Sequence, residues 1–286
     1  MAAGSPMRAG RVCGYGTGKI MTQTFSSADL VLAARLEAAD ATNVMRMAQS
    51  AAGDAEFMAF EPIAGGFAVF AGAGSPMTHA MGIGMRGAVS EQELERMEAF
   101  FRDRGSPCLI DLCPMADTSV IAFVQSRPYR VIEFNNVMAR RIEPGEIFER
   151  VEGVRPIQEG ELPHWSRVVS EAFSENMPVN DSMVGLMSAT CKGVHCWFAG
   201  EFEPVGGAAM GVQEGVALLS GDATLRSARR QGWQARLIRE RLSAAQRLGC
   251  QLASTTVLPG STSHRNYERA GFQLIYMRVN IMREFA

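Results

Sequence analysis

Several features that would assign a protein to a broad class are absent from this 286-residue sequence. No apolar run approaches the ~18–20 residues that a membrane-spanning helix needs, so we expect no membrane span. The formal net charge of −2 does not favour nucleic-acid binding, which usually requires a basic surface. Apolar residues make up 47% of the chain and charged residues 20%, which is typical of a globular protein with a sizeable core.

Cysteine is also scarce. The six cysteines are Cys13, Cys108, Cys113, Cys191, Cys196 and Cys250. Four residues separate the members of each close pair, which is wider than the usual zinc-binding spacing, and only His195 lies near either pair. We therefore predict no metal site. Buried free thiols in a reducing cytoplasm are the ordinary interpretation.

The first 20 residues contain no acidic residue and no apolar core long enough for a signal peptide. The segment from Gly14 to Lys19 superficially suggests a phosphate loop, but Cys13 replaces its first glycine and Ile20 replaces the Ser or Thr that should follow the lysine. We expect a flexible tail over 1–20, with Met21 as a candidate start.

Hydrophobic periodicity and turn residues predict the elements of the first half. A helix begins near Ser26 or Ser27, with Leu30, Ala34 and Ala38 on one side. Strands follow at 65–72 and 78–85, then a helix over 91–105 with a capping box of Ser90 and Glu93, a strand at 108–113, a helical stretch to about 126 and a strand at 129–140.

A charged segment with Pro144 and Gly145, over 141–155, separates this pattern from a second one. The second half is predicted to contain a strand near 152–157, helices at 161–173 and 182–190, and strands at 194–200, 204–213 and 216–225. The cofactor helix and the strands at 250–257 and 272–283 follow.

The two halves repeat one order of elements. Pro114 corresponds to Pro259, Ser119 to Ser263, and Tyr129 to Phe272, at an offset of 143 to 145 residues. This regular offset indicates an internal duplication, the alternative being two similar strand–helix–strand units that arose by chance.

Residues 223–249 combine a strand end, an arginine-rich turn and an amphipathic helix. A strand that leads into a glycine-bearing turn at a helix start directs unpaired backbone N–H groups to one point, where the helix dipole favours phosphate. Arg226, Arg229 and Arg230 add cations beside Gly232. The stretch therefore predicts an anion site, and specifically a pyrophosphate site.

The turn Arg229-Arg230-Gln231-Gly232-Trp233-Gln234 resembles the acyl-CoA pyrophosphate loop of the GNAT superfamily of N-acetyltransferases, whose pattern is Gln/Arg-x-x-Gly-x-Gly/Ala. Arg229 and Gly232 fit the pattern, whereas Gln234 departs from its final small residue. Downstream, Asn266-Tyr267-Glu268-Arg269-Ala270-Gly271-Phe272 resembles the superfamily's Tyr-(three residues)-Gly-Phe ending. Both motifs occur in the expected order and together cover roughly residues 150–286.

The resemblance implies an α+β fold of two GNAT-like domains, each a mixed, mostly antiparallel sheet flanked by helices. The expected domains are a degenerate one at 21–143 and an acetyl-CoA-binding one at 150–286. Acetyl-CoA is the implied cosubstrate, with its pantetheine along the strand end and its pyrophosphate on the loop. The residues expected to contact it are Ala223, Thr224, Leu225, Arg229, Arg230, Gln231, Gly232, Trp233, Gln234, Ala235, Ser263 and Asn266.

The first half lacks the corresponding loop. Its helix is preceded by a single arginine, and Glu91 and Glu93 in the first turn would repel phosphate. The counterpart of Tyr267 falls near Val124, which has no acid–base chemistry. We therefore expect the first half to bind no cofactor and to pack against the second half.

Acyl transfer from a thioester requires a neutral amine, stabilisation of the oxyanion and protonation of the departing thiolate. Tyr267 matches the tyrosine that protonates the thiolate in many superfamily members, and a phenol of pKa ~10 is chemically suited to this step. The alternative is that Tyr267 only packs beside Phe272. Asp222 is the candidate base, with Glu214 second, although ordered water is an alternative to either side chain.

Three further features have plainer interpretations. His264, one helical turn before Tyr267, is expected to be a solvated helix residue, and Cys250 a buried thiol rather than a nucleophile. Gln234 can still present its backbone N–H if its side chain turns away, and Trp233 is expected to pack rather than to hold the adenine.

The sequence thus predicts an acetyl-CoA-dependent N-acetyltransferase that acts directly on an amine of a small molecule or peptide, without nucleic-acid or membrane partners. The alternative is a non-catalytic acyl-CoA-binding or interaction protein of the same fold. The loop 174–181 is expected to help select the substrate.

Overall fold

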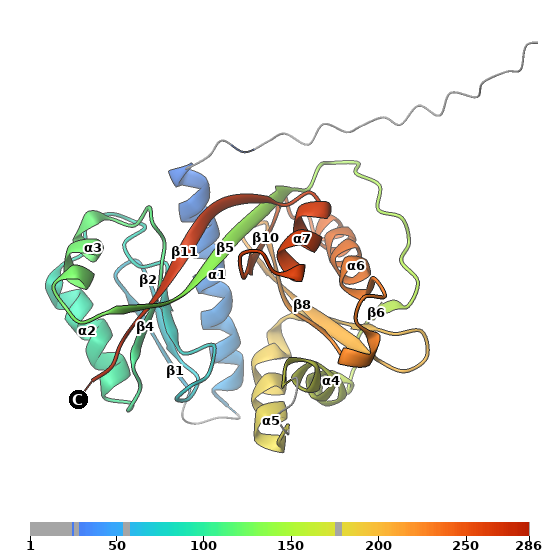
Figure 1. Ribbon diagram of the computed structural model, residues 1–286, viewed down its shortest axis with the longest axis horizontal. Helices are drawn as coiled ribbons and strands as arrows, with labels where there is room; N and C mark the ends of the chain where they lie inside the picture. The colour runs from blue at the N-terminus through green and yellow to red at the C-terminus, as the bar shows by residue number, and fades with distance from the viewer. Residues whose placement is uncertain (1–24, 26–28, 54–57, 175–178, 286) are drawn as a thin grey trace, which may run out of the picture.

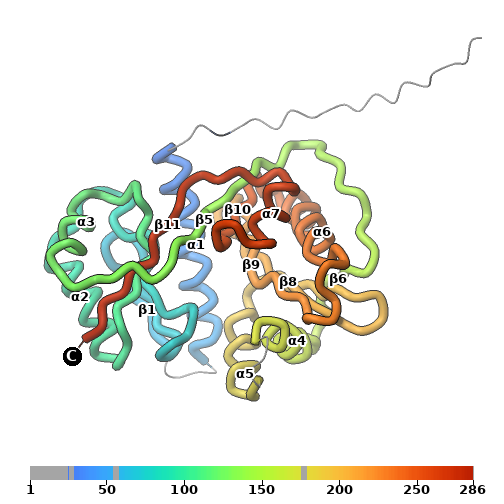
Figure 2. The backbone as a smooth tube through the Cα atoms, in the orientation of Figure 1, coloured from blue at the N-terminus to red at the C-terminus, as the bar shows by residue number. Residues whose placement is uncertain are grey.

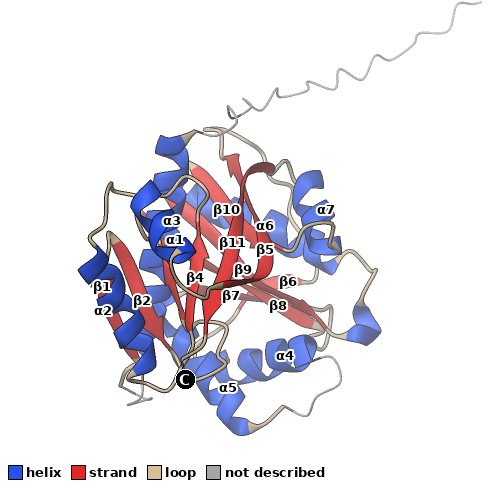
Figure 3. Cartoon of the chain, turned by 60° about the vertical axis from the view of Figure 1, so that its left-hand side comes forward, coloured by secondary structure: helices blue, strands red, loops and turns tan. Residues whose placement is uncertain are grey.

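The computed structural model describes residue 25 and residues 29–53, 58–174 and 179–285. Within these ranges the chain forms one continuous sheet of eleven strands with helices on both faces (Figures 1 and 3). The tail expected at 1–20, the candidate start at Met21 and the candidate caps Ser26 and Ser27 lie outside the described residues. Asp29 caps the first helix instead, because its carboxylate accepts a hydrogen bond from the N–H of Leu32.

The first half of the chain contributes helices α1 (Leu30–Ala51), α2 (Glu91–Arg102) and α3 (Thr118–Gln125) and strands β1 (Ala59–Ile63), β2 (Gly66–Phe70), β3 (His79–Met81), β4 (Cys108–Leu112) and β5 (Arg130–Arg141). Strand β1 was not predicted. The remaining strands and α2 fall where the sequence patterns placed them, and Ser90 caps α2 by accepting from the N–H of Glu93.

The second half contributes β6 (Val154–Pro156), α4 (Leu162–Ser174), α5 (Asp181–Thr190), β7 (His195–Ala199), β8 (Gly206–Gln213), β9 (Val216–Thr224), α6 (Trp233–Arg247), β10 (Leu252–Val257), α7 (Thr262–Arg269) and β11 (Gln273–Arg283). Two 3₁₀ turns, at Cys191–Gly193 and Arg226–Ala228, complete it. Apart from α7, for which no bounds were predicted, these helices and strands lie within a few residues of their predicted positions.

The two halves exchange their last strands. The strand order is β1-β2-β3-β4-β11-β5-β10-β9-β8-β7-β6, so β11 lies between β4 and β5, and β5 lies between β11 and β10. All neighbours pair antiparallel except β3 with β4 and β9 with β10, which are parallel. The long β5 and β11 cross the middle of the molecule side by side (Figure 1). Neither half therefore has a complete sheet of its own.

The core has a layer on each face of the sheet. Met138 of β5 packs in the cluster that includes α6, whereas its neighbours Val137 and Ala139 pack in the cluster that includes α1. Alternating side chains of one strand thus serve both layers. Helix α1 spans the two halves, and its Asn43 packs so closely on β8 that a Cβ added at Gly211 would lie 1.8 Å from the amide oxygen. A side chain at position 211 would therefore require the buried Asn43 to move.

Candidate functional site

The parallel strands β9 and β10 pair only over a short stretch and then diverge. Their register runs from Leu252 opposite Val216 to Ser254 opposite Leu218. Next along β10, Thr255 donates from its hydroxyl to the carbonyl of Leu219 over 3.0 Å. Strand β9 continues to Thr224 with β8 as its paired neighbour. The two strands therefore open into a splay at the end of β9 that leads into the predicted anion loop.

A β-bulge interrupts β9 inside the splay. Gly207 pairs with Ala223 and Ala209 with Ser220, so that Gly221 and Asp222 face a single residue of β8. Gly221 has a φ of +66°, a conformation that favours glycine. The extra residue changes which side chains point to which face, and Asp222 is turned toward α6.

The loop after β9 presents backbone N–H groups at the start of α6. Gly232 is the N-cap residue, with a φ of +83° and no side-chain cap, and Arg230 is also left-handed at +66°. The first hydrogen bond of the helix is that of Arg236 N–H to Gly232 C=O, at 3.1 Å. Within the described part of the chain, no hydrogen bond occupies the N–H groups of Trp233 to Ala235. This is the arrangement that binds phosphate at helix starts.

The arginines beside this loop have different surroundings. Arg229 donates to the carbonyls of Thr224, over 3.1 Å, and of Ala172, over 3.3 Å, so it braces the end of β9 against α4. Arg226 and Arg230 are exposed. Trp233 is buried in the core, and the guanidinium of Arg236 lies over its ring, 4.5 Å from the centroid. Both observations agree with a packing role for Trp233.

Gln234 turns its side chain away from the loop, toward α7. Its amide nitrogen donates to the hydroxyl of Ser263 over 2.8 Å, and its amide oxygen accepts from the side chain of Asn266 over 2.7 Å. Its backbone N–H remains at the helix start. The two α7 residues expected at the cofactor site thus hold the residue that departs from the motif.

Asp222 and Tyr267, the two candidate catalytic residues, lie in one hydrogen-bonded network. The hydroxyl of Tyr267 donates to Asp222 Oδ2 over 2.6 Å. Arg241 of α6 donates to the other carboxylate oxygen and, over 3.3 Å, to the hydroxyl of Tyr267. Arg241 was not predicted to take part, because an arginine in an amphipathic helix is usually on the exposed side, whereas this one has no exposed surface.

Arg241 is also bound to the backbone around the bulge. Its guanidinium donates to the carbonyls of Leu237 over 3.1 Å, Ala209 over 3.0 Å and Ser220 over 3.2 Å. Burial raises the pKa of Tyr267, and the charge of Asp222 raises it further, against the lowering effect of Arg241. The ring of Tyr267 packs edge-on to Phe272 at 4.9 Å.

The other residues considered for chemistry lie elsewhere or have other partners. Glu214 is in the hairpin before β9, at the opposite end of the strand from Thr224. His264 accepts from the N–H of Gly260 over 3.1 Å at the start of α7. Cys250 is buried, and burial raises the pKa of its thiol. Among the described residues, no group of three or more His, Cys, Asp or Glu is arranged to hold a metal ion.

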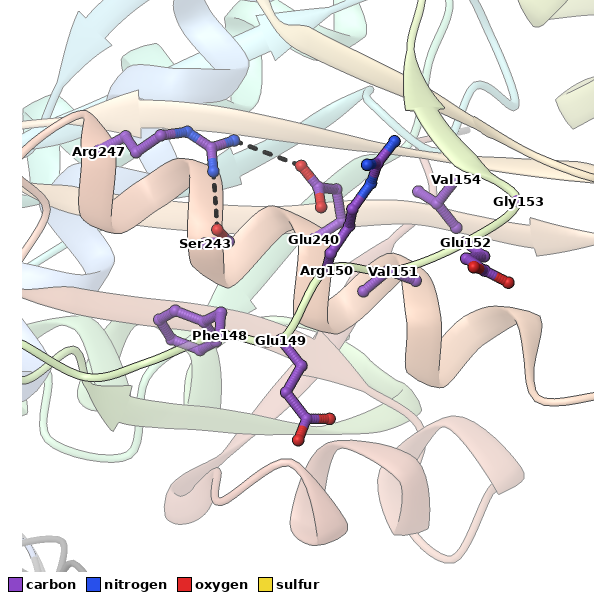
Figure 4. A pocket seen from close by; sticks show the side chains of 10 residues that line it. All are labelled: Phe148, Glu149, Arg150, Val151, Glu152, Gly153, Val154, Glu240, Ser243 and Arg247. Atoms are coloured by element: carbon purple, nitrogen blue, oxygen red, sulfur yellow. Dashed lines mark hydrogen bonds and ion pairs between the residues drawn. The ribbon is translucent and has the colours of Figure 1, made fainter.

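A surface hollow lies on the outer side of α6 (Figure 4). The connection from β5 to β6 passes around the helix there (Figure 2). Residues 148–154 of that connection face Glu240, Ser243 and Arg247, and Arg247 donates to Ser243 over 2.7 Å. Arg241 points from the same helix toward the sheet. The hollow is therefore separate from the hydrogen-bonded group of Asp222, Tyr267 and Arg241, which we call the Asp222 network.

No family model and no curated protein matches the chain. Solved structures do match its fold. A GCN5-related N-acetyltransferase from Kribbella flavida superposes with a TM-score of 0.64 at 16% identity, over 89% of this chain and 96% of that one. A GCN5-related N-acetyltransferase from Sphaerobacter thermophilus superposes with a TM-score of 0.52 at 19% identity, over 68% of this chain and 67% of that one.

These similarities show that the chain has the GNAT fold, and the expected α+β class is confirmed. The sheet is mixed and mostly antiparallel, with helices on both faces, as the motifs implied. The exchange of β5 and β11 between the halves was not predicted. Within the described residues, no helix combines the length and the apolar character needed to cross a lipid bilayer.

Proposed function

We propose that the chain is an acetyl-CoA-dependent N-acetyltransferase that moves an acetyl group directly to an amine of a small molecule or peptide. The observation that carries this proposal is the order of three structural features along the chain from β9 to the start of α6. The splay beside β9, the bulge at Asp222, and the free N–H groups after Gly232 follow one another in the order that thioester, pantetheine and pyrophosphate have in the cosubstrate.

In this proposal the pyrophosphate lies on the N–H groups of residues 232–235, where the helix dipole favours an anion. The exposed Arg226 and Arg230 supply the neighbouring positive charge. Pantetheine follows Ala223 to Leu225. Gln234 fits despite its size, because Ser263 and Asn266 hold its side chain on α7.

We propose one cosubstrate per chain, bound by the part at 150–286. The corresponding helix start in the first half has a side-chain cap, since Ser90 accepts from the N–H of Glu93. The N–H of Val89, just before the cap, donates to Ser119 Oγ over 2.9 Å. The carboxylates of Glu91 and Glu93 oppose a second anion there. On this view the part at 21–143 is a degenerate copy that supplies β5 as the neighbour of β10.

A second candidate function is binding of acyl-CoA without catalysis. It is favoured by the engagement of both candidate catalytic groups with Arg241, and by the absence of exposed surface on Tyr267. A protein that only binds acyl-CoA needs the loop but not the Asp222 network.

Isothermal titration with acetyl-CoA, followed by a thiol-release assay over a panel of amines, separates the candidates. We expect one binding event per chain and turnover of at least one amine. Binding without turnover favours the second candidate, and no binding contradicts both.

A matched pair of glycines at the two ends of α6 tests the site itself. Gly232 and Gly249 both have positive φ, +83° and +75°, and an added Cβ meets no atom within 4 Å at either. Both changes to alanine therefore cost about 1–2 kcal/mol of backbone strain. Only Gly232→Ala adds a methyl group at the proposed phosphate site, so we expect it to weaken acetyl-CoA binding about tenfold or more, with Gly249→Ala close to wild type.

A further inference from the structure

The members of the Asp222 network differ in how far they are buried. Tyr267 and Arg241 have no exposed surface, whereas the side chain of Asp222 is 10% exposed. The hydroxyl proton of Tyr267 points at Asp222 Oδ2 over 2.6 Å. Of these three side chains, only that of Asp222 therefore has surface that a bound thioester could reach.

The carboxylate is held in one orientation by groups that cannot easily move. The bulge at Gly221 turns Asp222 inward, and Arg241 binds its Oδ1. Arg241 is in turn fixed by the carbonyls of Ala209 and Ser220, which belong to the two strands that form the bulge. Such a charge-assisted, multiply bonded arrangement is suited to positioning one reactive group.

We propose that Asp222 is the catalytic residue that carries the transferred proton, and that Tyr267 and Arg241 are positioning residues that act through it. The proposal rests on the acetyltransferase function proposed above. It differs from the assignment that the sequence motif implies, in which the phenol of Tyr267 protonates the thiolate directly.

In the proposed reaction Asp222 transfers a single proton from the amine nitrogen to the thiolate sulfur. The amine nitrogen attacks the thioester carbonyl carbon, a C–N bond forms, and a proton passes from the nitrogen to the Asp222 carboxylate. The C–S bond then breaks with its electron pair on sulfur. Asp222 returns the same proton to the sulfur as an S–H bond, which regenerates the carboxylate and releases amide and free thiol.

Tyr267 is poorly placed for the direct role in two respects. Its hydroxyl has no surface from which to reach sulfur, and burial together with the charge of Asp222 raises its pKa. As a donor to Asp222 it instead fixes the carboxylate that faces the splay.

The test compares Asp222→Asn, Tyr267→Phe and the double variant in steady-state thiol release, with the amine that the wild type turns over. We expect Asp222→Asn to lower kcat by roughly 10²–10⁴-fold, the range for loss of a general acid–base group, with KM for acetyl-CoA unchanged. Tyr267→Phe should lower kcat only about tenfold. The double variant should match Asp222→Asn, because residues that act as a unit are not additive.

The division of each effect between kcat and KM adds a readout that a purely structural role would not change. Arg241→Lys should lower kcat and leave KM for acetyl-CoA unchanged, with acetyl-CoA titration and a thermal melt to show that each variant is folded. Glu240→Gln, the adjacent helix residue on the outer side, is the control and should retain wild-type kinetics.

Two results overturn the proposal while leaving acetyltransferase activity intact. One is a loss in Tyr267→Phe as large as that in Asp222→Asn, which would return the direct role to the phenol. The other is a double variant whose loss is the product of the single losses. A wild type that turns over no amine would instead refute the acetyltransferase function, and this proposal with it.

Discussion

Replacement of Arg278 by methionine is a direct test of the way the two halves are joined. Arg278 lies on β11, in the second half of the sequence, and is 2% exposed. It donates to Glu37 over 2.9 Å and 3.1 Å, to Asp40 over 3.1 Å and to Asp111 over 3.4 Å. These three acids belong to α1 and β4 of the first half, so the exchange of strands brings one guanidinium of the second half into a cluster of first-half carboxylates.

The expected cost of Arg278→Met is large because it leaves buried carboxylates without their cation. Breaking a buried ion pair by removing one partner typically costs about 3–5 kcal/mol. For a chain of this size, 1 kcal/mol corresponds to a change in Tm of about 2–4 °C, so we expect Tm to fall by roughly 6–20 °C. Burial raises the pKa of Glu37 even beside Arg278, and therefore the loss should shrink as the pH falls and Glu37 takes up a proton.

Differential scanning calorimetry over a pH series measures both effects. The control is Arg239→Met, which removes an exposed arginine whose nearest carboxylate, on Glu149, is 3.7 Å away. Surface pairs of this kind contribute about 0–1 kcal/mol. A Tm for Arg278→Met as high as that of Arg239→Met would refute the buried cluster, and with it the placement of β11 against the first half.

Three further outcomes are expected. Burial opposes protonation of His79, but the carboxylate of Asp111, 3.2 Å away, outweighs burial and raises the His79 pKa. Protonated His79 therefore stabilises the fold fully below the ordinary histidine pKa, and this stabilisation is lost as the pH rises through the raised pKa. The Tm should fall as the pH rises through these two values, and it should fall less steeply in His79→Asn. Gly207→Ala should cost about 1–3 kcal/mol in chemical denaturation, because an added Cβ would lie 2.5 Å from a buried indole nitrogen, whereas Gly185→Ala in open space should not destabilise. Residues 150–286 expressed alone should fail to fold by circular dichroism, because β10 and β11 lose the strand between them, and co-expression of the N-terminal part should restore the fold.

The offset on which the predicted duplication rests also relates two buried charged residues. Glu98 of α2 and Arg241 of α6 are separated by the same offset as the other paired positions and are both buried. Glu98 accepts from Tyr129 over 2.8 Å and from Arg283 over 2.6 Å. The corresponding helix position thus carries a buried charge in both halves, of opposite sign, and only in the second half does the charge lie beside the bulge.

Much of the local structure followed from the sequence. Helix α6 and strands β8 to β11 were predicted closely because apolar periodicity, glycine turns and caps act over a few residues. The turn of Gln234 away from the loop was also anticipated as a requirement, although its partners on α7 were not identified as such. The roles assigned to the loop residues, to Asp222 and to Tyr267 remain predictions.

The pairing of β5 with β10 and of β11 with β4 was decided by tertiary structure alone. Each last strand can satisfy its backbone hydrogen bonds in its own half or in the other, and a periodic pattern cannot distinguish the two. The same holds for Arg241. The sequence predicts that Arg241 lies on α6. It does not predict that Arg241 is buried, because its burial depends on the carboxylate of Asp222, which the bulge in β9 turns toward it.

The sequence by itself determined which segments form helices and strands and that α6 begins after Gly232, because these depend on short-range conformational preferences. The tertiary structure decided which half each last strand completes, which of Asp222 and Tyr267 keeps exposed surface, and which cation contacts both of them. Those outcomes depend on contacts between segments far apart in the chain, whose burial and hydrogen bonding no local pattern encodes.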